Sequence, residues 1–298
     1  MAEPGTTREV NAGPRGLRVI LVLGGGGIKG LAHVGAWRAV REAGIEVSEI
    51  IGTSIGGMIG AALAGGDDLD QLREKALDLK KPNLVTINRW AVLLNGIRQQ
   101  SVFRGDVFAD YVKSVIPVDS FAELSIPVSM NAVDLGTGET VWLGHGGDMN
   151  VSVSRAVTAS CALPVFYPPV EVNGRLLIDG GVLNNLPIDY AASRGAELII
   201  AVDVGSGGER DARQVVAQGM VAIHHRVTEI MGYPRKMEML DNWSGPPLVY
   251  ARPKIDKYST FEFGQTDFFL EEGYRAVKEA LANSSHLKSA AFESKRAG

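Results

Sequence analysis

The stretch with the clearest potential for chemistry is GTSIG at residues 52–56, which places Ser54 between Gly52 and Gly56. The G-x-S-x-G spacing is typical of a nucleophile elbow, in which a sharp turn between a strand and a helix exposes the serine side chain. Glycines suit such a turn because neighbouring chain passes close to it. The stretch predicts a nucleophilic serine, and helix N-capping by Ser54 is the structural alternative.

A second glycine-rich stretch, GGGIKG, occupies residues 25–30. A phosphate-binding P-loop is excluded because Lys29 is followed by Gly30 rather than by Ser or Thr. A dinucleotide fingerprint also fits poorly, since the next strand ends without the acidic residue that would hold a ribose. The remaining interpretation is an oxyanion hole, in which backbone N–H groups of Gly25, Gly26 and Gly27 stabilise a tetrahedral intermediate.

A serine nucleophile needs a base, and the usual histidine is not evident. The five histidines, at positions 33, 145, 224, 225 and 286, do not follow predicted strands. Asp179 does: it ends an apolar run and precedes Gly180 and Gly181. Burial in an apolar cleft would raise its pKa toward the range a base requires. Asp203 and Asp134 are rival bases, and capping of a turn is the structural alternative for Asp179.

The composition describes a globular protein of 298 residues, with 45% hydrophobic and 21% charged residues. Its net charge of −4 and the absence of a basic run argue against a nucleic-acid partner. The single cysteine, Cys161, excludes an internal disulfide and lies in an apolar stretch that predicts a buried, inert thiol. No histidine spacing indicates a zinc site.

The candidate catalytic residues lie in a sequence in which apolar runs alternate with amphipathic segments. This alternation predicts an α/β fold with a parallel sheet. Buried strands are expected at 18–23, 47–51 and 197–204, with further strands at 126–133, 139–143 and 247–252 and a hairpin at 170–178 that turns at Asn173 and Gly174. Helices are expected at 29–43, 56–64, 69–80, 104–116, 151–162, 188–193, 212–231 and 267–281.

The ends of the sequence are polar, and we expect a disordered tail at 1–16 and a polar tail at 286–298. No secretory signal and no membrane-spanning run are recognised, so the expected location is cytoplasmic, with at most a peripheral contact at the inner membrane face. An apolar segment around Trp90, Leu93, Leu94 and Ile97 is a candidate lid or lipid-contacting face, with packing on the domain as the alternative.

Four motifs, in this order, resemble those of the patatin-like phospholipase family. They are GGGIKG with LAHVG at 25–35, GTSIGG at 52–57, Ser160 with Pro164, Phe166 and Pro168, and Asp179-Gly180-Gly181. The resemblance implies one three-layer α/β/α domain with a central, mostly parallel sheet over 17–285. It also implies a Ser54–Asp179 dyad without histidine and an oxyanion hole at 25–27. Where the family often has arginine, this sequence has Lys29.

By this resemblance the sequence predicts a serine hydrolase acting on phospholipids, lysophospholipids or related esters, with neither metal nor cofactor. The alternatives are a thioesterase or transacylase that uses the same dyad, and a non-catalytic protein that binds acyl lipids. The sequence does not determine the oligomeric state.

Overall fold

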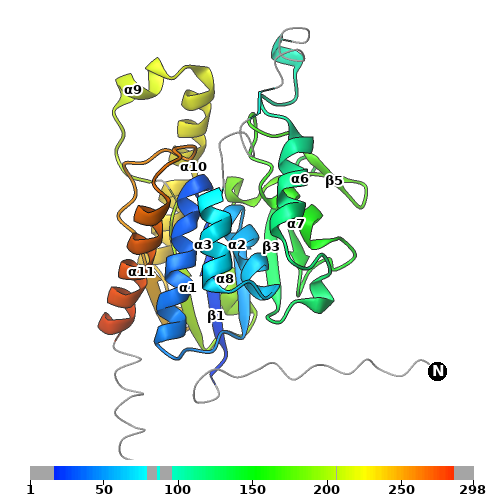
Figure 1. Cartoon of the computed structure of the whole chain (residues 1–298). Helices are drawn as coiled ribbons and strands as arrows, with labels where there is room; N and C mark the ends of the chain where they lie inside the picture. The colour runs from blue at the N-terminus through cyan, green and yellow to red at the C-terminus, as the bar shows by residue number, and fades with distance from the viewer. Residues whose placement is uncertain (1–16, 79–85, 88–95, 206, 285–298) are drawn as a thin grey trace, which may run out of the picture.

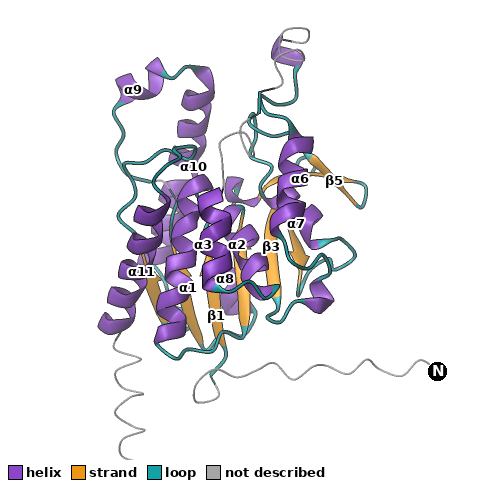
Figure 2. Ribbon diagram, viewed as in Figure 1, coloured by secondary structure: helices purple, strands orange, loops and turns teal. Residues whose placement is uncertain are grey.

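The computed structural model describes residues 17–78, 86–87, 96–205 and 207–284. Both predicted tails and most of the candidate lid segment, including Trp90, Leu93 and Leu94, lie outside the described residues, as does the side chain of Ile97. Within the described part, one sheet of eight strands runs through the molecule, with helices on both faces (Figures 1 and 2). This confirms the predicted α/β fold with a central, mostly parallel sheet.

The strands follow the order β5-β6-β3-β2-β1-β7-β8, and β4 pairs with β3. Their bounds are β1 Val19–Leu23, β2 Glu49–Thr53, β3 Val128–Asp134, β4 Thr140–Gly144, β5 Val170–Val172, β6 Arg175–Asp179, β7 Leu198–Val202 and β8 Leu248–Ala251. The strands from β3 through β2, β1 and β7 to β8 are parallel, whereas β4, β5 and β6 run antiparallel to their neighbours. The residues of β1, β2 and β7 are all buried, which explains the continuous apolar sequence of β1 and β7.

The helices form two outer layers. Their bounds are α1 Ala32–Glu42, α2 Ile55–Ala64, α3 Leu69–Asp78, α6 Gly105–Val115, α7 Val153–Ser160, α8 Ile188–Ser193, α9 Ala212–Ala217, α10 Met220–Asp241 and α11 Thr266–Asn283, with 3-10 turns at Gly27–Leu31, Gly96–Arg98, Phe121–Glu123 and Gly180–Val182. Alternate residues of β1 enter two separate cores. Leu21 packs in the core with α1, α2 and α11, and Ile20 packs in the core with α8 and the end of α10.

Most predicted elements are confirmed, including the hairpin, whose turn has positive φ at both Asn173 and Gly174. The helix predicted at 212–231 is wrong in its bounds. It breaks at Gly219, which has a φ of 87°, and then continues through Pro234 to Asp241. The extension is stabilised by Met239 and Leu240, which pack against the core beneath α8.

Helices α1 and α11 cross so closely that each needs a glycine. A Cβ on Gly35 would lie 1.7 Å from the carbonyl oxygen of Leu270, and a Cβ on Gly273 would lie 1.8 Å from that of Ala32. We expect Gly35→Ala to lower the free energy of unfolding by roughly 3 kcal/mol, because the helices must separate to admit the methyl group.

Urea unfolding followed by circular dichroism measures this effect. Gly232→Ala on α10 is the matched control, because no atom lies within 4 Å of the added methyl group. It should leave stability unchanged or raise it by up to about 1 kcal/mol. Equal stability of Gly35→Ala and the wild type would contradict the close crossing.

Candidate active site

The serine and the aspartate identified in the sequence meet because two strands end against each other along one edge of β3. Thr53, the last residue of β2, pairs with Asn131, and Asp179, the last residue of β6, pairs with Ala132. Strand β4 occupies the other edge of β3 over the same residues. Strands β2 and β6 therefore approach head to head, and the residues at their ends, Ser54 and Asp179, lie side by side.

Ser54 is held at the elbow in an unusual backbone conformation. Its φ is 54° and its ψ is −124°, a combination that costs energy for a residue with a side chain. The elbow is tight, since a Cβ on Gly52 would lie 2.4 Å from the nitrogen of Gly57 and one on Gly56 would lie 2.0 Å from the carbonyl oxygen of Leu23. Helix α2 starts at the next residue, so the half-buried serine lies at the positive end of a helix.

The hydroxyl of Ser54 donates a hydrogen bond of 2.7 Å to Oδ2 of Asp179. The other carboxylate oxygen, Oδ1, accepts a hydrogen bond of 2.7 Å from the backbone N–H of Gly181. Asp179 is 4% exposed, and burial raises its pKa to about 6, although the hydrogen bonds from Ser54 and Gly181 oppose the rise. A carboxylate with this pKa is still ionised at neutral pH and is a stronger base than an ordinary aspartate.

The glycine-rich turn after β1 faces the serine. A Cβ on Gly25 would lie 3.4 Å from the Cβ of Ser54. The N–H of Gly25 donates to the carbonyl oxygen of Asn185 at 3.2 Å, so the expectation that Gly25 offers an oxyanion donor does not hold. Among the described residues, no acceptor takes the N–H of Gly26 or of Gly27, and both glycines are half-buried. These two N–H groups are the candidate donors.

Asn185 was missed in the sequence. Its side-chain Nδ2 donates to the carbonyl oxygen of Gly25 at 2.9 Å, while its own carbonyl accepts from the Gly25 N–H. The two bonds fix the glycine-rich turn to the loop after Gly181. Ser160 makes a second supporting contact, because its Oγ accepts from the N–H of Ser54 at 2.9 Å. Only the position of Asn185 six residues after Asp179 hinted at its role.

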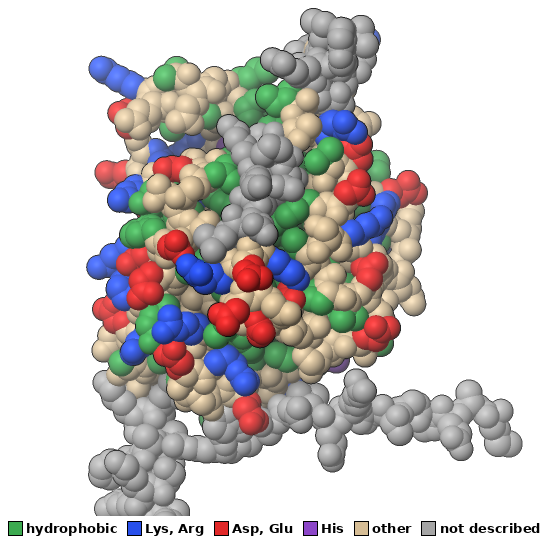
Figure 3. Space-filling model, in the orientation of Figure 1, with side chains coloured by type: hydrophobic (Ala, Val, Ile, Leu, Met, Phe, Trp, Pro, Cys, Tyr) green, Lys and Arg blue, Asp and Glu red, His purple; other side chains and the backbone are tan. Residues whose placement is uncertain are grey.

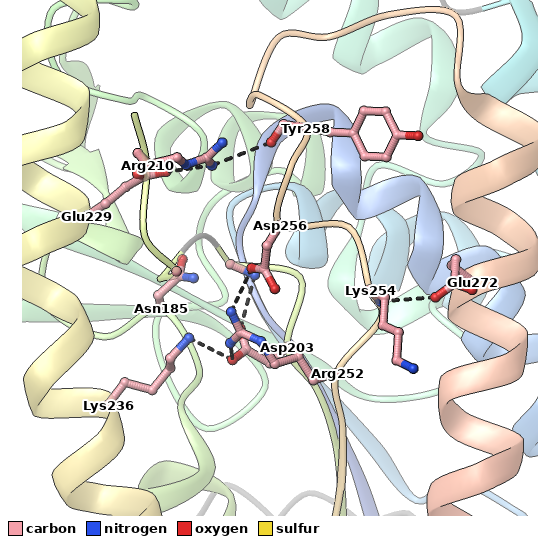
Figure 4. A network of polar contacts seen from close by, with 12 residues as sticks. Asn185, Asp203, Arg210, Glu229, Lys236, Arg252, Lys254, Asp256, Tyr258 and Glu272 are labelled. Carbon is pink, nitrogen blue, oxygen red and sulfur yellow. Dashed lines mark hydrogen bonds and ion pairs between the residues drawn. The ribbon is translucent and has the colours of Figure 1, made fainter. Parts of the chain in front are cut away.

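The rival bases are engaged elsewhere, so the structure contradicts both assignments. Oδ2 of Asp203 accepts from Lys236 on α10 at 2.6 Å and from Arg252 at 2.8 Å (Figure 4). It also accepts from the hydroxyl of Tyr250 at 2.7 Å. Burial alone would raise the pKa of Asp203, but the two cations hold it below its ordinary value. Asp134 caps a turn by accepting from the N–H groups of Gly136 and Thr137.

Lys29 is fully buried behind the glycine-rich turn. Burial lowers its pKa to about 8, and the negative charges of Glu229, Asp256 and Asp203 oppose that shift. Its position favours bracing of the turn over contact with a substrate phosphate. The neighbouring Gly30 allows the turn to pack against the start of α2, since a Cβ on Gly30 would lie 2.4 Å from the side chain of Ile55.

His33 is also buried, and its Nε2 is bonded to the carbonyl oxygen of Gly24 at 2.8 Å. Burial lowers the pKa of His33 to about 4, which keeps the ring neutral. Cys161 is buried too, and burial raises its pKa, as expected for an inert thiol. In the described part of the chain no cluster of three metal-ligating side chains occurs, and no helix there is long and apolar enough to cross a membrane.

A cavity of about 860 Å³ opens above the dyad. On one side it is lined by the apolar side chains of Met58, Phe108, Leu163, Tyr167 and Phe261. Tyr167 stacks on Phe108 with ring centroids 4.6 Å apart, so these two buried aromatic side chains also form part of the cavity wall. The opposite wall is α10, which contributes polar groups that include His225, Arg235 and Glu238.

The family model described as patatin-like phospholipase matches residues 21–192, more than half of the chain. Patatin-like phospholipase domain-containing protein 7 of Rattus norvegicus is 32% identical over 290 residues, which cover 87% of this chain and 20% of that protein. An NTE family protein of Mycobacterium tuberculosis is 35% identical over 198 residues, 65% of this chain and 52% of that protein.

Among solved structures, VipD from Legionella pneumophila has a similar fold, with a TM-score of 0.57 at 16% identity, covering 95% of this chain and 72% of that one. The chain covers 20% of the length of the first curated relatives that it matches. The match of the family model, together with the order of the motifs, confirms the resemblance seen in the sequence, and the chain belongs to the patatin-like phospholipase family.

Proposed function

We propose that this protein is a serine hydrolase that cleaves acyl ester bonds of lipids through an acyl-enzyme on Ser54. The observation that carries the proposal is the hydrogen bond of 2.7 Å between the Ser54 hydroxyl and the buried carboxylate of Asp179. A nucleophile and a base in contact, beside unused N–H donors and below an apolar cavity, meet the requirements of acyl transfer.

In the first half of the reaction, Ser54 attacks the carbonyl carbon of the ester while its proton passes to Oδ2 of Asp179. Negative charge then develops on the carbonyl oxygen. The N–H groups of Gly26 and Gly27 and the positive end of α2 are placed to stabilise it. Asp179 returns the proton to the oxygen of the departing alcohol as the tetrahedral intermediate collapses.

In the second half, a water molecule attacks the acyl-enzyme. Asp179 accepts a proton from that water, and the same N–H groups stabilise the second intermediate. The proton returns to Ser54 Oγ when the fatty acid leaves. The hydrogen bond from Gly181 to Oδ1 keeps the carboxylate oriented, with Oδ2 toward the serine, through both halves.

The cavity supports a lipid substrate. Its apolar side, which includes Met58, Phe108 and Leu163, suits an acyl chain, and the polar wall on α10 suits an alcohol or headgroup. Relatives whose names describe them as patatin-like phospholipases support the same class of substrate. Phospholipids, lysophospholipids and simpler esters all fit this description, and a thioester or an acceptor other than water would use the same dyad.

Release of fatty acid measures the proposed activity. We expect the purified protein to hydrolyse p-nitrophenyl butyrate and to release fatty acid from phosphatidylcholine or lysophosphatidylcholine. Binding of the lipids without release, together with no reaction of Ser54 with a fluorophosphonate, would overturn the proposal in favour of a lipid-binding protein. The presence of both dyad residues in contact favours the enzyme. We also propose an intracellular location.

The pKa of Asp179 predicts how activity depends on pH. Asp179 accepts a proton only when it is ionised, so activity is present above its pKa of about 6 and is lost as the pH falls through that value. We expect kcat/KM for p-nitrophenyl butyrate to be level near neutral pH and to fall about tenfold per pH unit below the pKa. Circular dichroism across the same range shows whether the fold persists. A level profile down to pH 4 in a folded protein would contradict this role.

A further inference from the structure

Helix α9 and the first half of α10 form an arm, residues 212–231, that projects beyond the body of the molecule (Figures 1 and 2). No residue of α9 is buried. Within α10 the buried residue is Lys236, which lies beyond the arm and donates a hydrogen bond to the carboxylate of Asp203. The second half of α10 is therefore fastened to the sheet. Within the arm Val221 packs against the core, whereas the large apolar residues described next do not belong to either core.

The arm carries a stripe of large apolar side chains in solvent. Six of the eleven large hydrophobic residues that are exposed in the described part of the chain lie here: Val216 (62%), Met220 (76%), Ile223 (40%), Val227 (47%), Ile230 (52%) and Met231 (75%). On α10 they recur every three or four residues, which places them on one face of the helix. Such a concentration of exposed apolar surface marks an interaction site.

The opposite face of the same helix lines the active-site cavity. His225, Thr228, Glu229, Gly232 and Tyr233 contribute to the cavity wall, and none of the six stripe residues does so among the described residues. By helical geometry the two sets point away from each other. A surface that covers the stripe would thus lie directly beside the cavity.

The charge of the arm indicates what kind of surface fits. The arm contains Arg213, Arg226 and one acidic residue, Glu229, although the whole chain has a net charge of −4. Glu229 lines the cavity on the face opposite the stripe and is ion-paired with Arg226. Arg213 and His224 are exposed. The body below shows acidic and basic side chains intermixed (Figure 3). An apolar stripe with an exposed arginine, whose one acidic residue lies on the opposite face, complements the headgroup region of an anionic bilayer.

We propose that residues 212–231 dock the protein on an anionic lipid bilayer, with the stripe inserted among the lipids and Arg213 at the level of the phosphates. This inference rests on the proposed function in one respect: a lipid substrate accounts for the position of the stripe beside the cavity. Docked in this way, the cavity takes its substrate from the bilayer rather than from free solution.

Co-sedimentation of the full chain with vesicles tests the proposal. We expect the wild type to bind vesicles of phosphatidylcholine mixed with phosphatidylglycerol, and to bind less at high salt. Met220→Asp combined with Ile223→Asp should weaken binding by about tenfold or more, because it places two carboxylates in the stripe. Hydrolysis of p-nitrophenyl butyrate, a soluble ester, should not change, since neither residue lines the cavity.

Met149→Asp is the matched control, because Met149 is 46% exposed and follows β4, at the end of the sheet opposite the arm. It should bind vesicles like the wild type. Absence of wild-type binding, equal binding by the double variant, or equal loss in the control would overturn the proposal. The proposal would also be overturned if the wild type formed a dimer and the double variant abolished that dimer but still bound vesicles. If the docking proposal is right and the proposed hydrolase function is wrong, the wild type should bind vesicles but form no fluorophosphonate adduct on Ser54.

Discussion

Replacing Ser54 with alanine is expected to abolish both covalent labelling by a fluorophosphonate and hydrolysis of p-nitrophenyl esters. The hydroxyl is the atom that forms the acyl bond in the proposed reaction, and no other group can substitute for it. The expected loss in kcat is roughly 10⁴-fold or more, as for the nucleophile of other serine hydrolases. The fold should persist, because the side chain contributes one hydrogen bond and little packing at a half-buried position.

Intact-mass spectrometry measures the first effect, with one adduct expected on the wild type and none on Ser54→Ala. Ser114→Ala is a suitable control, since Ser114 is exposed on α6 and bonds the carbonyl oxygen of Tyr111. It should label at the wild-type rate. An adduct that persists on Ser54→Ala at the wild-type rate would mean that another residue is the nucleophile.

The second large effect is expected for Asp179→Asn, which should lower kcat for p-nitrophenyl butyrate by about 10²- to 10⁴-fold. Asparagine has nearly the shape of aspartate, and its oxygen can still accept from the N–H of Gly181 while its NH2 group faces the Ser54 hydroxyl, but it cannot take the proton of the serine. The rate of fluorophosphonate labelling should fall with kcat. The decline of activity below the Asp179 pKa of about 6 should also disappear, since the titrating group is gone.

The other candidate aspartates supply the controls for this experiment. Asp134→Asn keeps an oxygen for the N–H groups of Gly136 and Thr137, so it should retain nearly full activity. Asp203→Asn leaves Lys236 and Arg252 without their carboxylate, so it should mainly lower stability. If Asp203→Asn abolished labelling in a folded protein while Asp179→Asn did not, the assignment of the base would be reversed.

The sequence predicted most strands of the sheet and singled out a serine and an aspartate that the structure brings into contact, and the reason can be defined. Strands that are buried on both faces, such as β1 and β7, consist of unbroken apolar residues, and this signal is local. Ser54 follows β2 and Asp179 ends β6, each after a short apolar run and near glycines, so their types and positions could be recognised before their contact was known.

The features that the sequence did not reveal depend on contacts between distant segments. The N–H of Gly25 is unavailable because the loop carrying Asn185 folds against it, and a glycine run cannot show which of its N–H groups is taken. The length of α10 depends on packing of Met239 and Leu240, which outweighs the interruption expected at Pro234. Tertiary contacts decided both outcomes.

The head-to-head approach of β2 and β6 has a consequence for how the protein can be studied. Ser54 and Asp179 are 125 positions apart, and their contact exists only when both strands are seated on β3. A chain that is collapsed but incompletely paired has a serine without its base. The fraction of molecules in which a fluorophosphonate labels Ser54 would therefore measure the fraction of native protein. During refolding this fraction would follow completion of the sheet, independently of any spectroscopic signal from helices.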